Sequence, residues 1–384
     1  MGFEFATAAR IIFGPGALAE VPPLAARAHR RPFVITGKSA DRALPLLEEL
    51  KKHDLEPTTF SAPSEPTTDL VEKALASARE AGSDLVISIG GGSVVDTGKA
   101  VAAMLANPGR LSDYLEVVGL GKPLARAAVT HIAVPTTAGT GAEVTRNSVI
   151  AVPEKKVKVS MRSPLMLPAA AVVDPLLTHS MPPGVTASTG LDALTQLAEA
   201  YISNKANPLT DGLCREGLRR AGRSLGAAYE NGANASARED MSLASLLSGL
   251  ALANAGLGAV HGFAGPLGGM FAAPHGVICA RLLPHVFAAN LNALKSRDPQ
   301  SPALARFDEI GRLLTGSKAA AAKDGIEWLA SLSAALNVPG LSQFGLTKDR
   351  IPTVVAKTQK SSSAKGNPIP LAPDELTAIL TAAL

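Results

Sequence analysis

The sequence predicts two domains, an α/β domain built on a parallel sheet and then an all-helical domain. In the first half, short β-rich runs alternate with amphipathic helical patterns, an order typical of a parallel sheet with helices on both faces. The pattern changes at residues 170–183, where a last strand-like run is followed by a Pro-Pro-Gly break. Because only helical periodicity follows, we place the domain boundary near residue 182 and expect domains 1–182 and 183–384.

Strands of the α/β domain are expected where Val- and Ile-rich runs lead into glycine or threonine. These runs cover residues 31–37, 84–92 and 131–137, and the final one begins at residue 170. The helical patterns between them cover residues 43–55, 67–82 and 94–106. Parallel sheets place ligands at the carboxyl ends of their strands, so the loops after these strands are candidate binding sites.

Long helical patterns fill the second half of the chain. They cover residues 187–203, 210–229, 237–257, 303–314, 319–336 and 373–384. Asp374 and Glu375 lie in the first turn of the last pattern, where carboxylates favour the helix dipole. The most apolar window, residues 246–260, is expected to be a buried core helix, and residues 357–372 a loop.

The composition excludes several classes of protein. A net charge of +4 over 384 residues is too small to indicate nucleic-acid binding. No run of about 18 apolar residues predicts a membrane span, and the N-terminus lacks the pattern of a signal peptide. The two cysteines, Cys214 and Cys279, are far apart and fit a reducing compartment. We therefore expect a cytoplasmic protein.

A glycine-rich turn stands between a predicted strand and a predicted helix. It contains Gly91, Gly92 and Ser93. Backbone N–H groups of such a turn, together with the helix N-terminus, bind phosphate, and glycine lets the ligand approach closely. The structural alternative is that Ser93 and Asp96 form a Ser-x-x-Asp cap. The turn does not match the G-x-G-x-x-G dinucleotide pattern.

A second polar loop follows the predicted strand at residues 131–137. It lies in the run VPTTAGTGAEVT, whose hydroxyl side chains include Thr136, Thr137 and Thr140. The alternative is that these hydroxyls form hydrogen bonds with the local backbone and contact no ligand. Beside the glycine-rich turn, the second loop favours a shared nucleotide site, and we expect both loops to face one nucleotide.

Two histidines and an aspartate form a candidate metal site. His261 and His275 lie in a glycine-rich segment, each followed by a glycine, while Asp192 and Gln196 share one face of a predicted helix. Two imidazoles and a carboxylate suit Fe(II) or Zn(II). Taken singly, each residue is more commonly structural, and Asp192 would also favour a helix dipole. Cys279 is either a further ligand or a small buried apolar residue.

Together these motifs resemble the iron-containing, or group III, alcohol dehydrogenase family. The resemblance covers nearly the whole chain and rests on GGGSVVDTGKA, AVPTTAGTGAEVT, VVDPLLTHSMPP, GLDALTQLAEAYIS, HGFAGPLGGMFAAPHG and KGNPIPL. It implies the dehydroquinate synthase-like fold, with a nucleotide-binding α/β domain, a helical metal-binding domain and a cleft between them. It also implies reversible NAD(P)-dependent oxidation of a small-molecule alcohol, in a homodimer.

The resemblance implies roles for individual residues. On the metal side, Asp192, His261 and His275 match three of the family's four ligands and would form the catalytic centre. For the cofactor, the residues that would contact the pyrophosphate are Gly91, Gly92, Ser93 and Asp96. Those that would contact the rest of the nucleotide are Thr136, Thr137, Thr140, Val149 and Lys158.

Two positions depart from the family pattern. The family's fourth ligand is a histidine, and here it is Gln196, whose amide oxygen is a harder and weaker ligand. With this change the site would bind its metal less tightly, bind a different metal, or bind none. Many members have a further histidine at the position of Gly265, so we expect the proton to leave through water or a ribose hydroxyl.

The loop after the first predicted strand bears on the choice of cofactor. Where an acidic residue would bond the ribose 2′-hydroxyl, the chain has Gly37, Lys38 and Ser39. Gly37 carries no charge that would repel a 2′-phosphate, and Lys38 and Ser39 offer groups that bind one. We therefore expect NADP, or use of both cofactors.

The sequence thus predicts an NAD(P)-dependent oxidoreductase in which a divalent metal assists the interconversion of a small alcohol and its aldehyde or ketone. One alternative is a metal-independent reductase of an unsaturated keto acid, resembling maleylacetate reductases. Two others are a sugar-phosphate lyase or synthase resembling dehydroquinate synthase, and a nucleotide-binding protein without catalysis.

Overall fold

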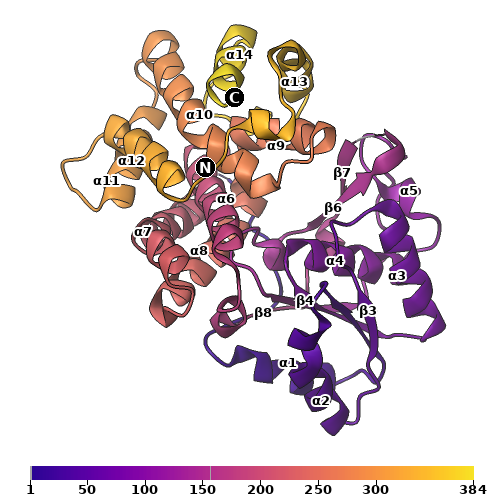
Figure 1. Cartoon of the computed structure of the whole chain (residues 1–384). Coiled ribbons are helices and arrows are strands. Elements are labelled where there is room, and N and C mark those ends of the chain that lie inside the picture. The colour runs from indigo at the N-terminus through magenta and orange to yellow at the C-terminus, as the bar shows by residue number, and fades with distance from the viewer. Residues whose placement is uncertain (1, 156) are drawn as a thin grey trace. The chain divides into compact units, whose positions relative to one another are not determined.

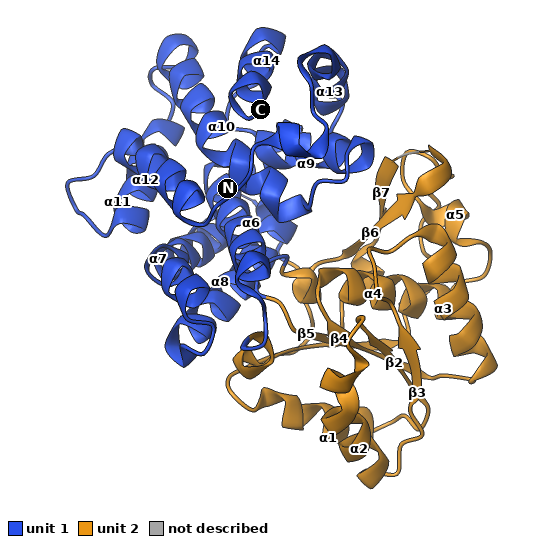
Figure 2. Cartoon of the chain, in the orientation of Figure 1, with its two compact units in different colours: residues 1–5, 138–140, 179–384 blue, residues 6–137, 141–178 orange. Residues whose placement is uncertain are grey.

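The chain forms two compact units, described here from a computed structural model (Figures 1 and 2). The structure describes residues 2–155 and 157–384. The α/β unit comprises residues 6–137 and 141–178, and the helical unit comprises residues 1–5, 138–140 and 179–384. Each unit has hydrophobic clusters of its own.

Six parallel strands form the sheet of the α/β unit, in the order β1-β8-β5-β4-β2-β3. Central residues alternate between two cores, since Val34 packs into one cluster and Phe33 and Ile35 pack into the other. The parallel pairing of these strands confirms the predicted parallel sheet. The strands are β1 (Ile11–Phe13), β2 (Pro32–Thr36), β3 (Thr58–Ser61), β4 (Leu85–Gly90), β5 (Thr130–Pro135) and β8 (Ala170–Val173).

Helices cover both faces of this sheet (Figure 1). Helices α1 (Val21–Ala25) and α2 (Leu44–Lys52) pack on one face. Helices α3 (Thr68–Glu80), α4 (Gly92–Ala106) and α5 (Leu111–Tyr114) pack on the other. An antiparallel hairpin of β6 (Asn147–Val152) and β7 (Val157–Arg162) extends the second layer and was not predicted.

The connection that follows β2 and the one that follows β4 run toward opposite edges of the sheet. Strand β2 leads to β3 at one edge, whereas β4 leads to its other neighbour, β5. Open parallel sheets bind ligands outside the carboxyl ends of strands at such a point. The loops after β2 and β4, which begin at Gly37 and Gly91, are therefore in the right place for a ligand.

In the part of the helical unit that the structure describes, nine helices pack around one large core of Ala, Leu and Ile side chains. Nearly all of α6 is buried from Gly190 onward, so this helix runs through the unit's interior. The helices described are α6 (Pro183–Ile202), α7 (Pro208–Glu230), α8 (Ala235–Ala255), α9 (Ala259–Met270), α10 (His275–Arg297), α11 (Ala303–Thr315), α12 (Ala322–Ala335), α13 (Ile351–Thr358) and α14 (Pro373–Ala382).

The expected core helix at residues 246–260 is in fact two helices. Helix α8 ends at Ala255, and α9 starts at Ala259 after a bend of 99°. Gly256 ends α8 with a φ of +70°, a conformation that L side chains rarely adopt. The loop expected at 357–372 also contains the end of α13 and a 3₁₀ turn at Ser363–Gly366.

Helix α10 is long and apolar enough to cross a membrane by length and composition, and the bent pair α8–α9 passes the same test together. Two thirds of the apolar window of α10 is buried inside the helical unit, 67% in all. Core helices of globular proteins also pass this test, because a helix that its neighbours cover on every side is apolar all round.

Candidate metal and nucleotide sites

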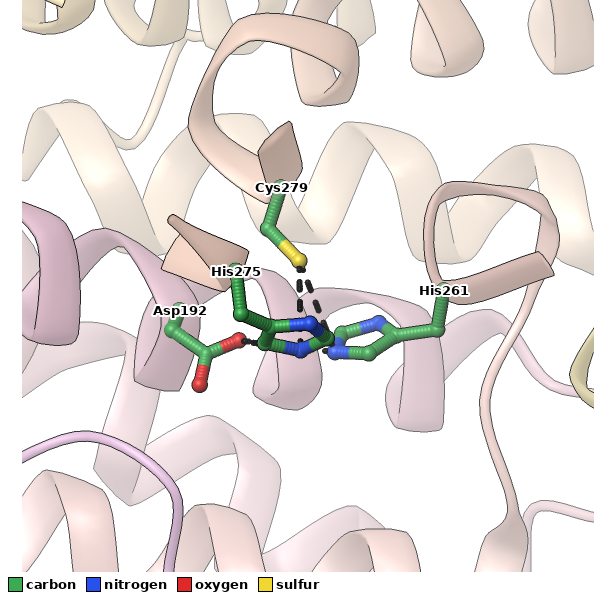
Figure 3. Close-up of side chains that lie close together, drawn as sticks. All are labelled: Asp192, His261, His275 and Cys279. Carbon is green, nitrogen blue, oxygen red and sulfur yellow. Dashed lines mark hydrogen bonds and ion pairs between the residues drawn. The ribbon is translucent and has the colours of Figure 1, made fainter. Parts of the chain in front are cut away.

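Four potential ligand atoms converge in the helical unit: Asp192 Oδ1, His261 Nε2, His275 Nε2 and Cys279 Sγ (Figure 3). All four lie within 4.8 Å of one another. The carboxylate oxygen is 3.4 Å from Nε2 of His261 and 3.6 Å from that of His275. The predicted trio is thus brought together, with a cysteine beside it.

Three helices supply these side chains. Asp192 projects from the buried middle of α6, His261 lies in the first turn of α9, and His275 is the first residue of α10. Gly276 lets α10 start close to α6, because a Cβ there would lie 2.1 Å from the Ser188 carbonyl oxygen. The glycine after His275 thus allows the close backbone approach expected from the sequence.

Glu199 fixes the orientation of His261. Its Oε2 lies 2.6 Å from Nδ1 of His261, and its Oε1 accepts a 2.7 Å hydrogen bond from the backbone N–H of Val260. Because a carboxylate accepts hydrogen bonds, Nδ1 carries a proton, which leaves Nε2 as the nitrogen that faces the cluster and would bind a metal. Carboxylate–histidine pairs orient metal ligands in this way. Sequence reasoning missed Glu199, although Asp192, Gln196 and Glu199 share a helix face by spacing.

Gln196 contacts Asp192 from the other side. Its Nε2 donates to Asp192 Oδ2 at 3.0 Å, and its Oε1 lies 2.7 Å from the Ser248 hydroxyl. If the amide were reversed, its oxygen would face a carboxylate oxygen, so this network sets the amide's orientation. Oδ2 is thereby satisfied, whereas Oδ1 is buried with no hydrogen-bond partner.

The charges in this cluster shift one another's pKa. The Cys279 charge, aided by Asp192, raises the pKa of His275, and the same partners raise that of His261 against the opposing effect of burial. Burial would raise the pKa values of Asp192 and Cys279, but the imidazoles outweigh it and lower both. A divalent cation can replace such shared protons. With an unpartnered oxygen, the donor set therefore fits a divalent metal.

In the α/β unit, the loops after β2, β4 and β5 lie at the ends of three adjacent strands. The N-terminus of α4 is uncapped by any side chain: its cap residue is Gly91, and the helix starts at Gly92. The alternative reading of Ser93 as the cap is thus wrong, because the helix begins one residue earlier. An uncapped N-terminus beside glycines suits a phosphate, and a Cβ on Gly91 would lie 3.4 Å from Thr137.

The other predicted cofactor residues are placed as follows. Asp96 accepts a 2.9 Å hydrogen bond from the Val149 N–H and lies 2.8 Å from Lys99 Nζ. Thr136 is buried, and its backbone N–H donates to the Gly90 carbonyl. Lys158 pairs with Glu65 at 2.6 Å. Thr140 belongs to the helical unit, and Lys38 and Ser39 are exposed after β2.

Comparison with known proteins agrees with both units. Residues 8–175 match the model of iron-containing alcohol dehydrogenase, and residues 186–384 match that of the Fe-containing alcohol dehydrogenase family, C-terminal. Alcohol dehydrogenase 4 of Saccharomyces cerevisiae is 35% identical, covering 96% of this chain and 95% of its own length. NAD-dependent methanol dehydrogenase of Bacillus methanolicus is 32% identical, with 93% of each covered.

A solved structure of 1,3-propanediol oxidoreductase superposes with a TM-score of 0.91 at 33% identity, covering all of both chains. Sequence, fold and site thus point to one class, and the chain belongs to the iron-containing alcohol dehydrogenase family. Within that class it is an oxidoreductase that acts on alcohols.

Proposed function

We propose that this chain is an NAD(P)-dependent, metal-assisted dehydrogenase that interconverts a small alcohol with its aldehyde or ketone. The convergence of Asp192 Oδ1, His261 Nε2 and His275 Nε2 carries the proposal. When bound, the metal would supply Lewis-acid chemistry to the substrate oxygen and the nicotinamide would carry the hydride.

The chain's own residues have distinct tasks in this site. Asp192, His261 and His275 would hold the metal, and Glu199 accepts a hydrogen bond from Nδ1 of His261, which leaves Nε2 facing the cluster. His275, whose side chain is 44% exposed, lies where the site meets solvent. Gln196 stays a predicted ligand, although its amide contacts favour a role in orienting Asp192.

For the cofactor, we propose that Gly91, Gly92 and Ser93 bind the pyrophosphate at the N-terminus of α4. Asp96 would hold the β6 backbone at Val149 beside this helix. The remaining nucleotide contacts fall to Thr136, Thr137, Thr140, Val149 and Lys158, as the family resemblance implies.

We further propose that the chain accepts NADP, alone or beside NAD. Gly37, Lys38 and Ser39 follow β2 at the point where the connections diverge, and this loop carries no carboxylate. One relative is named as NAD-dependent. If this chain differs from it in preferring NADP over NAD, we expect the difference to arise in this loop. We also propose a cytoplasmic location, which the two free buried cysteines fit, and a homodimer, which the family resemblance implies.

The test is a comparison of the full-length protein with His275→Ala. After chelation and reloading with Fe(II) or Zn(II), wild type should bind one metal per chain by mass spectrometry and reduce NAD(P)⁺ with short alcohols. Loss of an outer partner costs about 10–100-fold in metal affinity or activity, so loss of a direct ligand should cost more.

The exposed His53→Ala serves as the control and should retain both metal and turnover. Unchanged turnover in metal-loaded His275→Ala would contradict the ligand role. Full activity of the stripped enzyme on an unsaturated keto acid would point instead to a metal-independent reductase.

A further inference from the structure

We propose that Cys279 is the fourth protein ligand of this metal, in the position that the family resemblance gives to residue 196. The site would then hold the ion through one carboxylate oxygen, two imidazole nitrogens and one thiolate sulfur. The inference rests on the metal site proposed above, and it concerns which side chain completes that site.

The spacing of the four donor atoms carries the inference. With bond lengths of about 2.0 Å to oxygen and nitrogen and about 2.3 Å to sulfur, a tetrahedral site has N–O edges of about 3.3 Å and N–S edges of about 3.5 Å. The observed N–O separations are 3.4 and 3.6 Å, and Cys279 Sγ lies 3.8 Å from His261 Nε2 and 3.7 Å from His275 Nε2. These four separations lie within a few tenths of an ångström of the tetrahedral values, and the remaining two are no longer than 4.8 Å.

The local structure of α10 places the thiol there. Cys279 lies four residues after His275, so both side chains stand on one helix face. Its side chain is fully buried, and its sulfur contacts a ring nitrogen of each histidine (Figure 3). If Cys279 only filled space, apolar side chains would suit its sulfur as neighbours. Instead, two imidazole nitrogens and a buried carboxylate oxygen without a hydrogen-bond partner lie around it.

Gln196 is engaged elsewhere, which leaves the fourth position to the thiol. Its amide nitrogen is bonded to Asp192 Oδ2 and its oxygen to the Ser248 hydroxyl, within a buried network. To bind the metal through its oxygen, the amide would have to give up both bonds. As arranged, it keeps Oδ2 occupied and directs Oδ1 toward the histidines.

A thiolate changes which ions the site prefers. Sulfur ligands favour Zn(II) and other softer ions, whereas a glutamine oxygen would favour harder ions such as Mn(II) or Mg(II). We therefore expect the stripped protein to select Zn(II) strongly over Mn(II), and Cys279→Ser to narrow that selectivity by at least about tenfold.

The deciding measurement is X-ray absorption of the full-length protein loaded with Zn(II), with Co(II) absorption spectra alongside. Wild type should show a sulfur shell at about 2.3 Å and a sulfur-to-cobalt charge-transfer band. Cys279→Ser should lose both signals. Cys214→Ala, which changes the chain's other buried cysteine, should keep both.

The outcomes separate the two proposals, and the wild-type spectra do not depend on any variant folding. One metal per chain with only nitrogen and oxygen neighbours would overturn the role of Cys279 and leave the metal-assisted dehydrogenase standing. No metal bound under any loading would overturn both.

Discussion

At the scale of single residues, Lys99 shows how a buried charge is held in the α/β unit. Its side chain is fully buried in α4. The ammonium nitrogen lies 2.8 Å from Asp96 Oδ1 and bonds to the Ala142 carbonyl, the Thr145 hydroxyl and the Asn147 carbonyl. Lys99 thus ties α4 to the loop that follows β5, and these oxygens would lose a charged hydrogen-bond donor without it.

Lys99→Met should therefore destabilise the protein by about 3–5 kcal/mol, the usual cost of breaking a buried ion pair by removing one partner. Chemical denaturation with global fitting measures this change. Lys73→Met, at an exposed position of α3, should stay within about 0.5 kcal/mol of wild type. Equal effects of the two substitutions would show that the contacts of Lys99 contribute little.

The metal cluster shows what residue types alone can indicate. Asp192, His261 and His275 were predicted because imidazole and carboxylate are metal ligands in any fold, and the structure brings them together. Cys279 was left open between two roles, since a thiol acts as a ligand or as a small apolar group according to its neighbours. His275 lies one turn before Cys279 on α10, but the other two neighbours, Asp192 and His261, come from α6 and α9.

At the scale of elements, the packing of α4 on the sheet depends on Gly98. A Cβ at this position would lie 1.8 Å from Ser88 Oγ and 2.9 Å from His131 Nε2. These two side chains, on β4 and β5, share a 2.9 Å hydrogen bond. The helix can therefore approach these strands only because residue 98 has no side chain.

We expect Gly98→Ala to destabilise the protein by roughly 1–3 kcal/mol, because the new methyl group overpacks the helix–sheet interface. Thermal unfolding followed by circular dichroism would show a lower Tm. Gly226→Ala is the matched control: nothing lies within 4 Å of a Cβ there, so better helix propensity should stabilise α7 by up to about 1 kcal/mol. A rise in Tm for both variants would contradict the packing argument.

Strongly periodic elements were predictable, and glycine- and proline-rich ones were not. The helices at 67–82 and 94–106 were close to α3 and α4 because apolar residues recur at helical spacing. Helices α9 and α10 were missed, since Pro266 and Pro284 lie inside them and glycines surround both histidines. Burial in the helical unit offsets these poor local propensities.

At the scale of the whole molecule, one buried acid adds a pH dependence to the free energy of folding. Glu143 is buried in the α/β unit, and burial raises its pKa from 4.5 to about 7 against the weaker effect of Lys99. Between these values the folded chain holds a proton that the unfolded chain has released. The free energy of unfolding therefore falls as pH rises from 4.5 to 7 and does not recover above.

Glu143→Gln removes this titration and keeps the size of the side chain. Relative to wild type, the variant should gain stability on going from about pH 4 to about pH 8, by roughly 3 kcal/mol from the size of the pKa shift. Denaturation curves at both pH values measure the gain. A difference between the two proteins that does not change with pH would show that Glu143 is ionised in the folded state.

The sequence by itself determined four strands of the α/β half with the helices between them, the parallel sheet and the family. It also supplied the residue types at the metal site, because periodicity and side-chain chemistry are properties of local sequence. Only the tertiary structure decided that Glu199 bonds to His261, that Gln196 bonds to Asp192 Oδ2 and that Cys279 lies beside the other three donors. These facts depend on how α6, α9 and α10 pack, and packing is set by the sum of many distant contacts rather than by any one segment.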